Sequence, residues 1–113
     1  MASYIFKKEK IILRCSGGAM SLLYDFLIDT IQREKLPISD AFKVFLSRMQ
    51  QYVDAGPILI DLEKHLPTSE DRIMLKTLVS KVIIRLKEEK SLSDEVAPRI
   101  IGGFEEFRDK ILD

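Results

Sequence analysis

The sequence predicts an all-α fold, a five-helix bundle around one central apolar helix at about residues 19–35. Three observations lead to this prediction. Apolar residues cover more than half of the circumference of the central helix, three further segments repeat apolar residues at helical spacing, and short connections rich in Pro, Gly or Ser separate the predicted helices. The 113 residues are expected to form a single domain, 1–113.

The stretch AMSLLYDFLIDTIQREK is the predicted central helix. Such a broad apolar surface must be covered by other elements, because it would drive association if it were exposed. Ser16, before Gly17-Gly18, is the predicted N-cap, and Pro37 disfavours helical geometry at Leu36. At 3.6 residues per turn the stripe comprises Met20, Leu23, Tyr24, Leu27, Ile28 and Ile31, widened by Leu22 and Phe26.

Residues 3–14 fit the bundle poorly. The triplets Tyr-Ile-Phe and Ile-Ile-Leu favour β-structure and flank the charged run Lys-Lys-Glu-Lys. This pattern favours a short N-terminal strand pair or an extended arm, with a helical start as the alternative. The connection lacks the Asn-Gly or Asp-Gly that is typical of a tight hairpin.

Caps and breakers define the next two helices. Ser39 is the predicted N-cap of a second helix over 40–55, which ends at Gly56-Pro57. Pro57 then opens a short third helix, ILIDLEKHL (58–66), which ends before a second proline.

The last two helices show clear apolar periodicity. A fourth helix is predicted to be capped by Thr68 or Ser69, with acidic residues in its first turn and basic residues in its last. A fifth is predicted to be capped by Ser93, with Gly102-Gly103 weakening its middle and offering a point at which it splits.

Composition narrows the classes of function. The 18 basic residues balance the 18 acidic ones, which argues against a nucleic-acid partner. A single cysteine cannot form a disulfide framework, so the cytoplasm is the expected compartment. No secretory signal is apparent, and no apolar run reaches the roughly 18 residues of a membrane span.

Two positions resemble catalytic or ligand-binding sites, but each has a simpler structural interpretation. The segment Cys15-Ser16-Gly17-Gly18 places backbone N–H groups at a helix start, yet it lacks the phosphate-loop and dinucleotide motifs, and the cysteine lies in an apolar run. His65 near a helix end favours a cation beside the last carbonyls over a general base. We therefore expect no enzyme, with no catalytic residues, no cofactor and no metal site.

Charge is unevenly distributed, and this is the most informative feature for function. Between residues 54 and 71 there are five carboxylates and a single lysine. These charges form ordinary solvated faces, or face basic segments within the same domain, or bind a basic partner surface. The candidate partner-binding residues are Asp54, Asp61, Glu63, Glu70 and Asp71.

The cations of segment 76–90 are the basis of an alternative function, a helix-turn-helix-like nucleic-acid-binding regulator. The cations do not line one face, and the acidic start of this helix would repel phosphates. A helical oligomeric scaffold is a second alternative, because the helices are unusually apolar for a monomer of this size.

A mostly helical chain of this size with the acidic segment DAGPILIDLEKHLPTSED resembles the small immunity proteins of bacterial toxin systems, including contact-dependent growth inhibition. The resemblance is one of size and character across the whole chain, without a shared motif. It implies stoichiometric binding of a cognate toxin, often a nuclease, whose basic cleft is covered by acidic residues. We therefore predict a protein-binding module with a basic protein partner, no membrane partner, and homo-oligomerisation as a further possibility.

Overall fold

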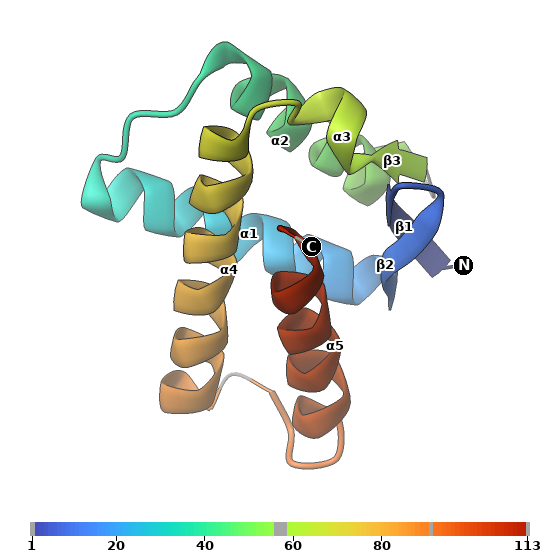
Figure 1. Cartoon of the computed structure of the whole chain (residues 1–113). Coiled ribbons are helices and arrows are strands. Elements are labelled where there is room, and N and C mark those ends of the chain that lie inside the picture. Colours follow the sequence, from blue (N-terminus) through green and yellow to red (C-terminus); the bar gives the residue numbers. More distant parts are fainter. Residues whose placement is uncertain (1, 56–58, 91, 113) are drawn as a thin grey trace.

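The computed structural model, which describes residues 2–55, 59–90 and 92–112, is a mixed α/β fold (Figure 1). The predicted all-α class is wrong, because three segments pair into a sheet of order β2-β1-β3. The strands are β1 (Ala2–Lys7), β2 (Lys10–Ser16) and β3 (Leu59–Asp61). The helices are α1 (Gly17–Glu34), α2 (Asp40–Ala55), α3 (Leu62–His65), α4 (Ser69–Glu89) and α5 (Ala97–Lys110).

The predicted N-terminal strand pair is confirmed as an antiparallel hairpin of β1 and β2. Its turn is made by Lys8 and Glu9, both at positive φ (51° and 65°), the backbone geometry of a two-residue type I′ turn. An Asn-Gly pair adopts this geometry with less strain and is the sequence signal for such a turn. Because Lys-Glu stands in its place, the sequence alone does not reveal the turn.

The hairpin contains an irregularity that sets which side chains face the core. Ile5 pairs with Leu13 and Phe6 pairs with Ile11, so Ile12 is the extra residue between them. As a result Ile12 and Leu13 are both buried although they are consecutive, whereas Ile11 is exposed.

The predicted third helix, 58–66, is wrong in its first half. Leu59–Asp61 forms a strand parallel to β1, with fully buried Ile60 opposite Ile5, and only Leu62–His65 is helical. The extended backbone of Asp61 serves as the N-cap of α3, so the helix cannot begin earlier. Gly56, Pro57 and Ile58, which include the predicted breaker and helix start, lie outside the described residues.

The central helix is confirmed, although α1 begins two residues before the predicted start. Ser16 is its N-cap, as expected, and its hydroxyl accepts the Ala19 N–H at 3.1 Å. Met20, Leu23 and Leu27 are fully buried. Helices α2 and α4 and strand β2 pack against α1, and Figure 1 shows it crossing the molecule between them.

The structure also tests the other predicted caps. The Ser39 hydroxyl accepts the Phe42 N–H, and the Thr68 hydroxyl accepts the Asp71 N–H, as expected for N-caps of α2 and α4. The side-chain cap predicted at Ser93 is wrong. Its carbonyl instead accepts the N–H groups of Val96 and Ala97, and α5 starts with no side-chain cap.

Helix α5 is continuous through Gly102-Gly103, and it runs beside α4 (Figure 1). Fully or nearly fully buried aromatic side chains from α2 and α5 fill much of the core, together with aliphatic residues of every other element. These aromatics are Phe42, Phe45, Phe104 and Phe107. In the described part of the chain, none of the helices combines the length and the apolar character needed to cross a membrane.

The glycine pair of α5 generates a stability prediction. A Cβ added at Gly102 or Gly103 meets no atom within 4 Å. Alanine is favoured over glycine in a helix interior, so Gly102→Ala and Gly103→Ala should each raise the free energy of unfolding by about 0.5–1 kcal/mol. Urea denaturation of the two single variants and the double variant measures this. A loss of stability in either single variant contradicts the open space described around the pair.

Candidate functional site

The candidate carboxylates lie at the starts of two helices that follow one another in the chain. Asp61 is the N-cap of α3 and Glu63 is in its first turn, while Glu70 and Asp71 are in the first turn of α4. Asp54 belongs to α2, but its side chain lies outside the described residues. Asp61 and Glu70 are exposed, and Glu63 and Asp71 are partly buried.

The structure holds the carboxylates of α3 in fixed positions. One oxygen of Asp61 accepts the N–H groups of Glu63 at 3.1 Å and of Lys64 at 3.4 Å. One oxygen of Glu63 accepts the Lys8 N–H at 2.9 Å, which ties α3 to the β1–β2 turn. Each of these carboxylates keeps a second oxygen that can accept from a cationic group.

Asp71 is held in the same way at the start of α4. Its carboxylate accepts the Ser39 hydroxyl at 2.8 Å and so links the starts of α2 and α4. Glu70, the next residue along the chain, is exposed. The acidic residues therefore combine helix capping with positions at the surface, and sequence reasoning had not foreseen their structural contacts.

The surface around these carboxylates is not uniformly acidic. A hollow of about 240 Å³ beside Glu63 is lined by cations of the hairpin and of α4. Its residues are Lys7, Lys8, Glu63, Ser69, Arg72 and Leu112. A segment that is acidic in sequence is thus a mixed surface in three dimensions, because the fold brings β1 and α4 against α3.

The cations of α4 contact acidic residues of neighbouring helices. Arg85 lies 2.7 Å from an oxygen of Asp29 and 2.9 Å from one of Glu89, and its guanidinium lies 4.5 Å from the centroid of the Phe26 ring. Lys81 pairs with Glu34 of α1. These contacts pair the cations of α4 with acids of α1 and of α4 itself, and none of them involves the acidic segment 54–71.

This pairing gives the nucleic-acid alternative little support. Phosphates would compete with carboxylates for Lys81 and Arg85, and Lys87 also lies 3.6 Å from Glu105 of α5. Lys81, Arg85 and Lys87 therefore link α4 to α1 and α5.

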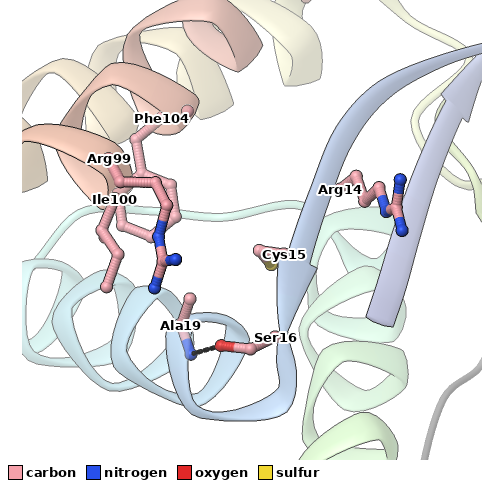
Figure 2. A pocket seen from close by; sticks show the side chains of 8 residues that line it. Arg14, Cys15, Ser16, Ala19, Arg99, Ile100 and Phe104 are labelled. Atoms are coloured by element: carbon pink, nitrogen blue, oxygen red, sulfur yellow. Dashed lines mark hydrogen bonds between the residues drawn. The ribbon is translucent and has the colours of Figure 1, made fainter. Parts of the chain in front are cut away.

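A cavity of about 570 Å³ lies beside Cys15, between the end of β2, the start of α1 and α5 (Figure 2). Ser16 and Ala19 lie at the helix start, and Ile100, Gly103 and Phe104 line the side formed by α5. Figure 2 shows Cys15 on the cavity side of β2 and Arg14 directed to the opposite side of the strand. The cavity wall is therefore mostly apolar, with Arg99 as the cation on the α5 side.

The thiol of Cys15 stays protonated near neutral pH, and a protonated thiol is a poor nucleophile. Burial raises its pKa to about 11, because a thiolate is poorly solvated there. The interpretation of Cys15 as a small structural residue in an apolar run agrees with this environment.

The imidazole of His65 is shifted in the direction that favours its neutral form. Desolvation by burial lowers its pKa, the positive charges of Arg48 and Lys64 lower it further, and Asp61 opposes them. Near neutral pH His65 is thus poorly suited to the role of a cation at the end of α3 that its position suggested.

The outer face of the sheet carries large side chains that sequence reasoning missed. In β1, the inward residues Ser3, Ile5 and Lys7 are buried, whereas Tyr4 and Phe6 point outward and are half-buried. Leu59 of β3 pairs with Tyr4, and Ile11 of β2 pairs with Phe6. The signal was present as apolar residues on both faces of β1 and β2, but the register was needed to interpret it.

Within the described residues, no group of three or more His, Cys, Asp or Glu side chains is arranged to hold a metal ion. Comparisons with protein-family models, with curated proteins and with solved structures found no match to this chain.

The raised pKa of Cys15 predicts that its thiol is alkylated slowly in the folded protein. Relative to the ordinary value of 9.0, a pKa of about 11 lowers the thiolate fraction at pH 8 by roughly 100-fold. The greater nucleophilicity of a more basic thiolate offsets part of this, so alkylation should be at least about tenfold slower than in the urea-unfolded chain. Iodoacetamide labelling followed by mass spectrometry measures both rates. Equal rates contradict the buried, protonated thiol.

The lowered pKa of His65 predicts a pH-dependent stability. The unfolded chain binds the proton more tightly than the folded one, so the stabilising contribution of neutral His65 is present above pH 6.5 and falls as the pH drops through its folded pKa. His65 is the only histidine, so His65→Gln isolates its effect. Unfolding free energies between pH 7.5 and pH 5 should fall more steeply for the wild type than for the variant. Parallel curves contradict the shift.

Proposed function

We propose that this protein is a small cytoplasmic protein-binding module that neutralises a basic protein partner by one-to-one binding, as immunity proteins neutralise toxins. The observation that best supports this is that hydrogen bonds fix the carboxylates of Asp61, Glu63 and Asp71 at the starts of α3 and α4. Glu70 adds an exposed carboxylate beside them, and Asp54 completes the proposed set.

Preorganisation is what makes these carboxylates suitable for recognition. A side chain already held by a backbone N–H or a hydroxyl loses less conformational freedom when it binds. Its charge also accelerates encounter with a basic surface and penalises partners of the wrong sign. The nearby cations of Lys8 and Arg72 would then favour a partner whose basic residues are arranged to fit between them, which adds selectivity.

The test uses substitutions that remove charge and keep the structural hydrogen bonds. Asp61→Asn preserves the N-cap, Glu63→Gln preserves an acceptor for Lys8, and Asp71→Asn preserves an acceptor for Ser39. The binding partner to be tried is the protein encoded by the adjacent reading frame, co-expressed and titrated by calorimetry.

We expect each substitution to leave the unfolding free energy nearly unchanged. It should cost about 2–5 kcal/mol of binding free energy where the carboxylate is buried against a cation in the complex, and little where it stays at the rim. Glu88→Gln and Asp94→Asn are matched controls, because both residues are exposed and far along the chain from the start of α4: Glu88 is in the last turn of this helix and Asp94 is in the connection that follows it. Binding that is equally strong in all variants, or that weakens as much in the controls, contradicts the proposed surface.

A further inference from the structure

We propose that the outer face of the β2-β1-β3 sheet is the contact surface of a symmetric dimer of this chain, in which Arg14 of one copy faces Asp61 of the other. This inference goes beyond the proposed function and does not depend on it.

The outer face of the sheet is unusually rich in apolar side chains. A sheet with one side in solvent normally alternates apolar residues inward and polar residues outward. Here the inward side is buried by helices, and yet the outward positions hold two aromatic and two aliphatic side chains. They are Tyr4, Phe6, Ile11 and Leu59.

These side chains form one continuous patch. Tyr4 and Phe6 stack in the middle, with ring centroids 6.3 Å apart. Leu59 is 62% exposed on one side and Ile11 is 47% exposed on the other. Apolar groups clustered in this way favour association, because their removal from water is favourable.

The charges at the corners of the patch identify its occupant. Arg14 pairs with Tyr4 from β2, and its guanidinium carbon lies 5.8 Å from the centroid of the Tyr4 ring. Asp61 pairs with Phe6 from β3. The cation and the anion therefore stand at diagonally opposite corners of one face, and Leu59 and Ile11 occupy the other two corners.

A face with this arrangement is complementary to itself. A two-fold axis lying in the plane of the face and perpendicular to the line from Arg14 to Asp61 exchanges those two corners. Each copy then places its arginine opposite the other copy's aspartate, while Leu59 and Ile11 each lie near their own symmetry mates. The strands of the two copies cross steeply, close to the orthogonal class of sheet packing.

The patch is small, so the dimer should be weak. A standard stable interface buries about 800 Å² from each partner, whereas three short strands offer less than this. We therefore expect a monomer–dimer equilibrium with a dissociation constant in the micromolar range or above, measurable by sedimentation equilibrium of the full chain.

The apolar part of the proposal is tested by a matched pair of double variants. Ile11→Gln/Leu59→Gln should weaken dimerisation by at least about tenfold. Val44→Gln/Ile84→Gln removes side chains of similar exposure, 54% and 53%, from helices α2 and α4, and should leave it unchanged. Circular dichroism checks that all variants keep the fold.

The charged part is tested by a double-mutant cycle between Arg14→Glu and Asp61→Asn, the latter retaining the N-cap. Arg14→Glu should weaken dimerisation at least about tenfold, and clearly less in the Asp61→Asn background, because the new repulsion is then absent. Arg48→Glu, an equal charge change at an exposed position on α2, is the control and should have no effect.

Three results overturn the proposal. The first is that the protein stays monomeric at every concentration up to millimolar, in which case a different protein, and not a second copy, would be the partner of this face. The second is a dimer lost in the Val44/Ile84 variant and retained in the Ile11/Leu59 variant. The third is a dimer in which the effects of Arg14→Glu and Asp61→Asn are simply additive.

Discussion

The burial of α1 is the constraint on which the rest of the structure depends. Its apolar stripe is too broad for a single neighbour, so α2, α4 and the hairpin must all pack against it. Met20, Leu23 and Leu27 have no exposed surface, which shows that the coverage is complete along its core side. The hairpin leads directly into α1 through Ser16, so the sheet is held at the end of the helix that it helps to cover.

Charge on the helices serves this same packing. Asp29 and Glu34 project from the polar edge of α1 and meet Arg85 and Lys81 of α4, while Arg85 also lies over the Phe26 ring. Ion pairs with exposed members contribute little stability individually, so these contacts add to the apolar packing of α4 on α1 and do not replace it. The zero net charge of the chain is thus compatible with strongly charged individual segments.

The sequence was sufficient for features that depend on local physics, and insufficient for those set by pairing between distant strands. The N-caps at Ser16, Ser39 and Thr68 and the helices they begin follow from residue type and period. The helical prediction for Leu59–Asp61 is wrong because three residues are too few to show a strand period. The extended form of this segment depends on pairing with β1, more than fifty residues earlier.

The candidate site shows the same division. Exposure of Asp61 and Glu70 could be anticipated from an acidic, Pro-bounded segment, whereas the bonds from Lys8 to Glu63 and from Ser39 to Asp71 depend on tertiary packing. The neighbouring cations of the hairpin and α4 are likewise brought in by the fold, which is why a simple charge count overstates the acidity of this surface.

The two faces of the sheet place different demands on the same short strands. The inner face must supply apolar residues to cover α1, and Ile5, Leu13 and Ile60 do so. Phe6, Ile11 and Leu59 lie on the outer face and do not belong to the hydrophobic core formed by the described residues. The proposed dimer would remove these apolar side chains from water through a contact outside the chain. Asp61 belongs both to this face and to the proposed carboxylate set, so self-association and partner binding would compete for it.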